Sequence, residues 1–148
     1  MSWASEVWFP DPRDPAAYER RIADAGGIDF FVLASGATDG HVAFNQPGAP
    51  RDSRTRVVPL SETTRRDNLQ TSPSFGALEN VPPRGVTVGI DTIASAREAV
   101  MVVWGESKRL TFQRITGASG YDQSWPATVI HEVPIREIVA DAQAAVSS

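Results

Sequence analysis

The sequence places a carboxylate and an imidazole two residues apart, at Asp39 and His41, in a stretch that runs on to Gly48. An imidazole exchanges protons near neutral pH, and a neighbouring carboxylate orients its ring and stabilises its protonated form. The apolar run 28–34 before them is typical of a buried strand. Ligands of open α/β sheets bind beyond the carboxyl ends of the strands, so we expect Asp39 and His41 to belong to a site.

The elements expected around this pair alternate between strand and helix. Asp14 and Ser61 are suited to cap helices because their side chains can accept bonds from free backbone N–H groups. The pattern predicts helices over 16–25, over 63–69 or beyond, and from 106 or 107 to before 117. It predicts strands over 28–34, 86–90, 99–104 and 135–140. This alternation indicates a three-layer α/β/α, Rossmann-like parallel sheet, covered on both faces, in a single domain over 1–148.

Composition limits the classes of partner. The chain has 148 residues, 41% of them hydrophobic, which suffices for one core. A net charge of −4 argues against nucleic acid and anionic membranes as partners. Residues 51–68 nevertheless carry +2, which suits either a small anionic ligand or a solvated helix face. With no cysteine and two distant histidines, no metal site is expected, and the lack of a leader or apolar span predicts a cytoplasmic protein.

The residues around the pair form a longer string, Ser-Gly-x-x-Asp-Gly-His-Val-Ala-Phe-Asn-x-Pro-Gly over 35–48, continued by Asp-Ser-Arg-Thr-Arg at 52–56. Gly-Val-Thr-Val-Gly-Ile-Asp-Thr-Ile at 85–93, a strand, glycine and lysine at 102–108, and Trp-Pro-Ala-Thr at 125–128 follow in order. Together these segments resemble the glucosamine-6-phosphate deaminase/isomerase family of the 6-phosphogluconolactonase superfamily. Ala-Phe-Asn after the histidine favours the deaminase branch over the lactonases.

The resemblance implies a sugar-phosphate substrate, no cofactor, and ring opening with aldose–ketose proton transfer by Asp39 and His41. Gln46 stands where the family has the glutamate of its ring-opening relay, and because an amide cannot carry a proton we expect it only to orient the histidine. Lys108 matches the family's phosphate-binding lysine, although a lysine at a helix start is commonly solvated. A family arginine that also contacts the phosphate falls on Gln70.

Four further positions are implied as substrate contacts by the resemblance, namely Ser35, Gly36, Gly40 and Asn45. Asn45 is also suited to hold the loop through side-chain bonds to the backbone. The other reading of Asp39 and His41 is that they only satisfy backbone groups of the loop. Trp104 and Trp125 are expected to fill the core or to form a wall of the cleft.

Family members are longer on the N-terminal side, where they carry a glycine-rich phosphate loop and the aspartate that acts as the C1/C2 base. Neither feature is found in residues 1–14, so we expect the C-terminal portion of the enzyme fold, with an exposed apolar strand edge and face. Such a half-sheet is expected to associate with itself, to swap elements, or to pack with a separate N-terminal polypeptide. An enzyme, a non-catalytic sugar-phosphate-binding domain and an inactive fragment remain open as alternatives, with phosphogluconolactone hydrolysis as a lesser one.

Overall fold

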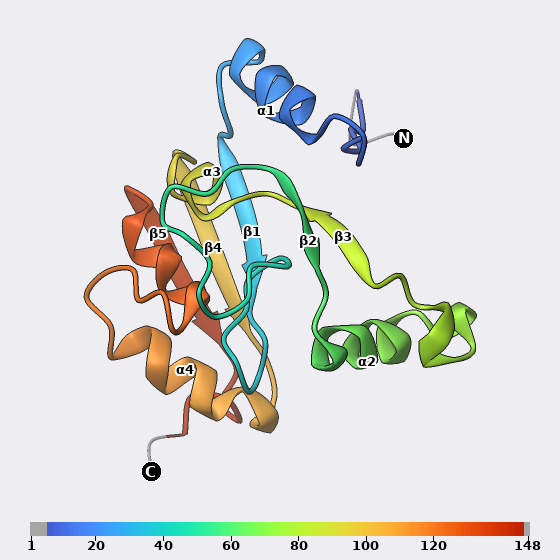
Figure 1. Ribbon diagram of the computed structural model, residues 1–148. Coiled ribbons are helices and arrows are strands. Elements are labelled where there is room, and N and C mark those ends of the chain that lie inside the picture. Colours follow the sequence, from blue (N-terminus) through green and yellow to red (C-terminus); the bar gives the residue numbers. More distant parts are fainter. Residues whose placement is uncertain (1–5, 147–148) are drawn as a thin grey trace.

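A parallel sheet with helices packed against it forms the body of the computed structural model, which describes residues 6–146 (Figure 1). Its strands are β1 (Phe30–Ala34), β4 (Glu98–Val103) and β5 (Ile135–Ala140), in the order β1-β4-β5. Both neighbouring pairs are parallel. The predicted α/β class with a parallel sheet is therefore confirmed. An antiparallel pair, β2 (Arg56–Pro59) and β3 (Arg84–Thr87), was not predicted.

The helices begin where the caps predict. The Asp14 side chain accepts a bond from the N–H of Ala17 at the start of α1 (Pro15–Asp24). The Ser61 side chain accepts a bond from the N–H of Thr64 at the start of α2 (Glu62–Thr71). The remaining helices are α3 (Ile90–Ala94) and α4 (Arg109–Thr116), with short 3₁₀ segments η1 (Pro73–Phe75), η2 (Leu78–Asn80), η3 (Glu106–Lys108) and η4 (Pro126–Glu132). The strand predicted over 86–90 is wrong at its end, because Ile90 begins α3 with its N–H bonded to Ser53 Oγ at 3.0 Å.

The hydrophobic core lies on one face of the sheet. Leu33, Met101 and Val103 point to this face and are at most 3% exposed. The side chains that cover them come from α3, α4 and η4, and are Ile90, Ile93, Ile115, Val129 and Ile130, all fully buried. Each such residue contributes about 1.5–3 kcal/mol through burial. This packing fixes the direction in which the three strands end.

The opposite face of the sheet is uncovered by the residues described, which corrects the prediction that strand 28–34 is covered on both faces. Phe30 and Val32 of β1 are 52% and 64% exposed. Trp104, expected in the core or the cleft, is 68% exposed, whereas Trp125 is buried as predicted. Alternate residues of a strand point to opposite faces, and an apolar run alone does not say which faces are covered. The expected exposed apolar face is confirmed.

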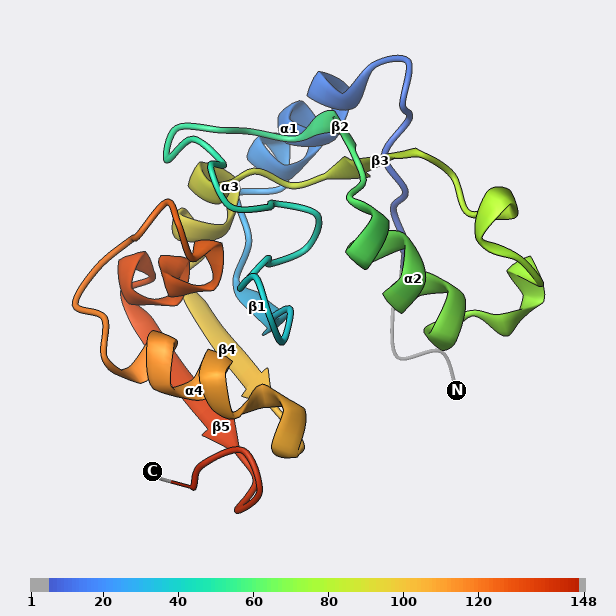
Figure 2. The same ribbon diagram turned by 60° about the horizontal axis from the view of Figure 1, so that its bottom comes forward.

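The segment from β2 through α2, η1 and η2 to β3 stands away from the sheet (Figures 1 and 2). Arg65 of α2 ties this arm together by donating to the carbonyls of Leu78 and Val81 at 2.7 and 2.9 Å. The arm carries α2 opposite the carboxyl end of β1, so two separate parts of the chain face one another there.

Candidate functional site

The loop after β1 brings Asp39 and His41 into contact. Isolated bridges pair Ser35 with Val42 and Val42 with Asn45, so the loop folds back on itself directly after the strand. Oδ1 of Asp39 lies 2.7 Å from Nδ1 of His41 and also accepts the His41 backbone N–H at 3.1 Å. The carboxylate therefore fixes both the ring and the backbone of the histidine.

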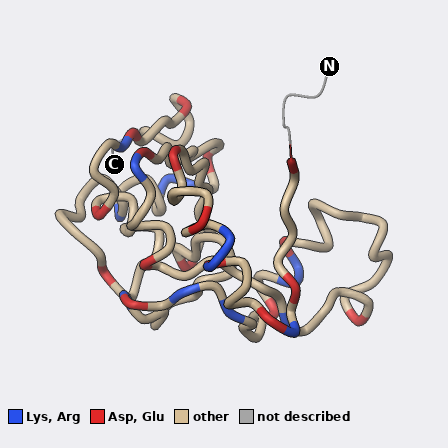
Figure 3. Tube along the Cα trace, turned by 90° about the horizontal axis from the view of Figure 1, so that it is seen from above, with Lys and Arg blue, Asp and Glu red and all other residues tan. Residues whose placement is uncertain are grey.

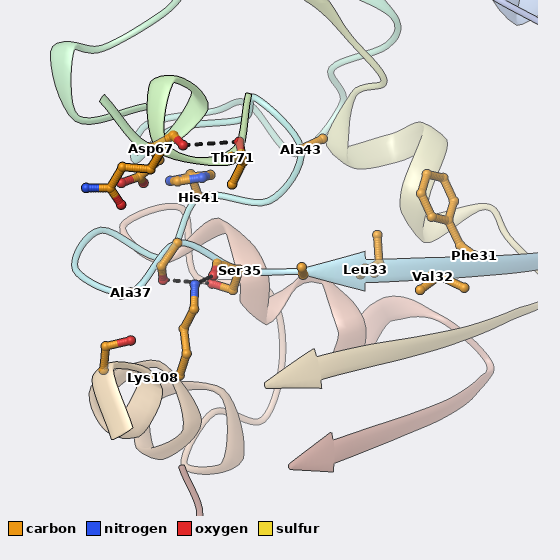
Figure 4. A pocket seen from close by; sticks show the side chains of 14 residues that line it. Phe31, Val32, Leu33, Ser35, Ala37, His41, Ala43, Asp67, Thr71 and Lys108 are labelled. Atoms are coloured by element: carbon orange, nitrogen blue, oxygen red, sulfur yellow. Dashed lines mark hydrogen bonds between the residues drawn. The ribbon is translucent and has the colours of Figure 1, made fainter. Parts of the chain in front are cut away.

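This contact decides which ring nitrogen can act on a ligand. A carboxylate on Nδ1 favours the tautomer that carries its proton there, which leaves Nε2 of His41 as the basic nitrogen. The His41 side chain is 15% exposed and lies at the wall of a cavity (Figure 4), whereas Asp39, whose side chain is 25% exposed, is not among the residues that line that cavity. The predicted pair is thus an imidazole that lines a cavity and a carboxylate that orients its ring without lining that cavity.

Two glycines make the arrangement possible. A Cβ at Gly36 would lie 2.5 Å from Cε1 of His41 and still closer to the Asp39 carboxylate. Gly40 has a φ of +65°, and a Cβ there would lie 2.5 Å from Nε1 of Trp125. Gly36 lines the cavity, while Gly40 packs under the Trp125 ring and accepts the Ala127 N–H through its carbonyl.

The cavity has a volume of about 550 Å³, within the range of small-molecule sites. It lies at the carboxyl end of β1, where open α/β folds place their ligands. His41, Ser35 and Lys108 line it together, Lys108 projecting from η3 across the cavity from the histidine (Figure 4). The complete lining consists of Phe31, Val32, Leu33, Ala34, Ser35, Gly36, Ala37, His41, Ala43, Asp67, Gln70, Thr71, Ser107 and Lys108.

The ammonium of Lys108 is half-buried and donates a bond to the carbonyl of Ser35. Burial lowers the pKa of Lys108, and the carboxylates of Asp67 and Asp39 oppose this shift. An ammonium has three N–H donors, so the bond to Ser35 leaves others for an anionic ligand. A bound anion would therefore offset the free-energy cost of partly removing the Lys108 ammonium from water.

The wall opposite Lys108 belongs to α2 and was only partly expected. Asp67, Gln70 and Thr71 all line the cavity. The sequence drew attention to Gln70 through its position in the family pattern, whereas the spacing gave no signal for Asp67 or Thr71 beyond their place on the same helix. Asp67 gives the cavity a second carboxylate in its neighbourhood besides Asp39.

Besides Asp39 and Gly40, two more sequence-predicted site residues do not line this cavity. The Gln46 amide donates to the carbonyl of Pro59 at 3.4 Å and lines a separate hollow of about 210 Å³. Its side chain is therefore directed away from His41, which it was expected to orient. Asn45 is fully buried and donates to the carbonyls of Val42 and Val88 at 3.2 and 2.8 Å. Asn45 holds the loop in place, which matches the second of its two predicted roles.

The basic segment 51–68 is largely paired within the protein, and acidic residues accompany basic ones along the trace (Figure 3). Asp91 accepts from Arg51 at 2.9 Å and from Arg54 at 2.6 Å. Arg66 pairs with Glu62 one turn before it on α2. These pairs favour the structural reading of the segment over a ligand site.

Two other kinds of feature are absent from residues 6–146. No cluster of three or more histidine, aspartate or glutamate side chains suited to a metal ion occurs in that part of the chain. Over the same residues, no helix has both the length and the apolar character needed to cross a bilayer.

Comparison with known proteins gives a consistent result. The family model for glucosamine-6-phosphate isomerases/6-phosphogluconolactonase matches residues 10–139. Over 129 residues the chain is 40% identical to the glucosamine-6-phosphate deaminase of Shouchella clausii, a match that covers 87% of this chain and 50% of that protein. The deaminase of Rhodopirellula baltica is 44% identical over 128 residues, or 86% of this chain and 49% of that protein.

Solved structures agree with these sequence matches. A monomeric glucosamine-6-phosphate deaminase superposes with a TM-score of 0.82 at 29% identity, over 97% of this chain and 56% of the other. The 6-phosphogluconolactonase of Trypanosoma brucei superposes with a TM-score of 0.65 at 20% identity, over 98% of this chain and 57% of the other, which shows a shared fold alone. The chain spans about half the length of the curated relatives it matches.

Proposed function

The chain belongs to the glucosamine-6-phosphate isomerase/6-phosphogluconolactonase family, and from this premise we propose that its cavity binds a sugar phosphate and moves a proton on it. One observation supports the proposal above the others: the imidazole of His41 and the ammonium of Lys108 line the same cavity at the carboxyl end of β1. A cation and a neutral base on one cavity suit a ligand with an anionic group at one end and a reactive hydroxyl at the other.

In the proposed reaction, Lys108 binds the phosphate and so sets the sugar ring against the histidine. Nε2 of His41 takes the proton of the anomeric hydroxyl, and the bond between C1 and the ring oxygen breaks. The ring oxygen then receives the proton from Nε2, giving the open-chain aldehyde and a neutral imidazole. Asp39 stabilises the imidazolium that exists between the two transfers, because its Oδ1 accepts the bond from Nδ1.

The following step, transfer of a proton from C2 to C1, requires a base that faces C2. Among the residues that line the cavity, Asp67 is the one carboxylate, and it lies on α2, exposed to water. We propose that this chain completes the isomerase or deaminase reaction of the family only when a base that faces C2 is present in the cavity.

A second function, sugar-phosphate binding without turnover, is favoured by the direction of Gln46. Its amide bonds to Pro59, and an amide could not continue a proton relay from Asp39 in any orientation. The two functions share the same binding geometry and differ in whether a proton is moved.

The test is a titration of the full chain with glucosamine 6-phosphate, followed by a turnover assay. We expect His41→Ala and Asp39→Asn to abolish turnover while binding changes little, and Lys108→Gln to weaken binding by about tenfold or more. The matched controls are His131→Gln, the other histidine, which bonds to Ile115, and Arg109→Gln, the cation beside Lys108. Saturable binding without turnover assigns the second function, and absence of binding refutes both.

We further propose that the chain acts in association, either with a second copy or with a separate polypeptide. The exposed apolar face of the sheet supports this proposal. The cytoplasmic location predicted from the sequence stays a prediction.

A further inference from the structure

One turn of the chain, which leads into η4, holds both ends of the loop that presents His41. At the first end of this loop, the N–H of Ala127 donates to the carbonyl of Gly40 at 2.8 Å. At the other end, the N–H of Gly48 donates to the carbonyl of Gln123 at 2.8 Å, and the Gln123 side chain donates back to the Gly48 carbonyl at 2.7 Å. The separation between the two ends of the loop is therefore set by this turn.

The turn, residues 122–128, is closed by hydrogen bonds of its own. The N–H of Trp125 donates to the carbonyl of Asp122 at 2.9 Å. The Thr128 hydroxyl accepts the N–H of Asp122 at 2.7 Å and donates to the carbonyl of Trp125 at 2.7 Å. Thr128 is fully buried, so water does not compete for these bonds. The 122–128 turn is thus a rigid support for the loop.

The indole ring of Trp125 lies directly against the backbone of Gly40. A Cβ at Gly40 would lie 2.4 Å from both Cδ2 and Cε2 of the ring. The ring is buried, and the guanidinium of Arg114 on α4 lies 5.5 Å from its centroid. Gly40 separates Asp39 from His41, so its left-handed backbone conformation sets how these two side chains are directed. The ring therefore supports the residue on which their contact depends.

We propose that Trp125 is a positioning residue, whose ring holds Gly40 in the conformation that brings the Asp39 carboxylate against the imidazole. Gln123 assists it by fixing the far end of the loop. The inference rests on the proposed function, because the groups that are positioned are the ones to which that function assigns the proton transfer. Trp125 itself does not line the cavity, so it acts through the loop and not on the ligand.

A ring that only filled the core would have a different requirement. Nε1 of Trp125 is buried and has no hydrogen-bond partner among residues 6–146, so the ring acts there through its surface. Phenylalanine keeps a flat aromatic surface, whereas leucine fills space without one. A core filler would accept either residue about equally, whereas a support for Gly40 requires the flat ring.

The experiment compares Trp125→Phe with Trp125→Leu in the full chain, at a temperature well below the unfolding of either variant. Proton NMR, recorded without substrate, observes the Nδ1 proton that His41 shares with Asp39. We expect the signal to persist with phenylalanine and to be lost with leucine. Trp104→Leu, which removes an indole that is 68% exposed, is the matched control and should keep the signal.

Turnover of glucosamine 6-phosphate separates positioning from stability. A misplaced base slows the proton transfer while the phosphate contact of Lys108 is retained, so kcat of Trp125→Leu should fall by about ten- to hundredfold with KM changed by less than about threefold. Loss of stability alone would lower the amount of folded protein and leave the imidazole signal of the folded fraction unchanged. If the chain binds sugar phosphate without turnover, the imidazole signal alone decides.

Gln123→Ala provides a second variant if leucine at position 125 prevents folding, because Gln123 is exposed and its loss leaves the core unchanged. We expect the shared imidazole proton to exchange with water at least about threefold faster than in Gln143→Ala, which changes an exposed glutamine outside the turn. Equal exchange in these two variants would overturn the proposal, as would equal behaviour of the phenylalanine and leucine variants. Since the NMR measurement needs no substrate, its failure is distinguishable from a failure to bind sugar phosphate.

Discussion

Replacing Gly36 by alanine should separate Asp39 from His41 while leaving the fold intact. The backbone at Gly36 does not have a positive φ, so alanine brings no conformational strain there. Its Cβ would lie 2.5 Å from Cε1 of His41 and closer to the Asp39 carboxylate, where ordinary contacts begin near 3.4 Å. The atoms that must yield are side-chain ends, so we expect the 2.7 Å contact of the pair to break. A charge-assisted hydrogen bond is worth about 1.5–3 kcal/mol, which corresponds to about 10- to 150-fold in turnover.

The assay compares Gly36→Ala with Gly120→Ala, whose added Cβ would meet Glu132 at an ordinary 3.6 Å. Thermal unfolding should change little in either variant. In the proton NMR spectrum, the signal of the His41 Nδ1 proton shared with Asp39 should be lost in the first variant alone. Turnover, or ligand affinity if the chain does not turn over, should fall in that variant alone. An unchanged imidazole signal together with unchanged activity would refute the assignment of Gly36 as the residue that makes room for the pair.

Three further changes follow from the same structure. Asp67→Asn removes a carboxylate near Lys108 and should raise the affinity for glucosamine 6-phosphate by about two- to tenfold in low salt, and by less in high salt. Calorimetry measures this affinity, and equal affinities of the variant and the parent protein would contradict the prediction. Thr111→Val deletes the buried hydroxyl that donates to the Gly36 carbonyl at 2.6 Å, and it should lower the free energy of unfolding by about 1–2 kcal/mol. An unchanged urea midpoint of unfolding would show that this hydrogen bond does not contribute to stability. Burial raises the pKa of Tyr121 from 10.0 to about 12, so the phenol ionises at lower pH in the unfolded chain than in the folded protein. The contribution of Tyr121 to the free energy of unfolding is therefore fully present below pH 10 and is lost as the pH rises toward 12. Tyr121→Phe should lack this loss between pH 10 and 12, and identical alkaline profiles would exclude the phenol as its source.

The elements with local signals could be predicted from the sequence. The strand predicted over 135–140 has those bounds in the structure, and the helix predicted to stop before Gly117 does so. In contrast, β2 was not predicted, and the strand predicted over 86–90 overlaps β3 only at its last two residues. Both strands have four residues, and β2 ends at Pro59, which weakens any strand pattern. Their pairing depends on contacts between segments far apart in the chain, which no local pattern reports.

The contact between Asp39 and His41 could be predicted from the sequence, whereas the directions of the side chains that follow them could not. The spacing of Asp39 and His41 correctly indicated a contact, because one intervening glycine lets the aspartate reach back to the imidazole. Beyond them, Ala43 adopts a φ of +50°, rare for a residue with a Cβ, and the chain reverses there. This reversal directs Asn45 into the interior and Gln46 toward a second hollow, and no residue type in this stretch predicts the reversal.

The two ends of the candidate site are held relative to each other by the single dipeptide Ser35–Gly36. The Ser35 carbonyl receives the ammonium of Lys108, while the Gly36 carbonyl receives the buried hydroxyl of Thr111. The Gly36 N–H donates to the backbone carbonyl of His41 at 2.8 Å. Since the dipeptide follows directly from β1, this strand also fixes the separation between the His41 imidazole and the Lys108 ammonium.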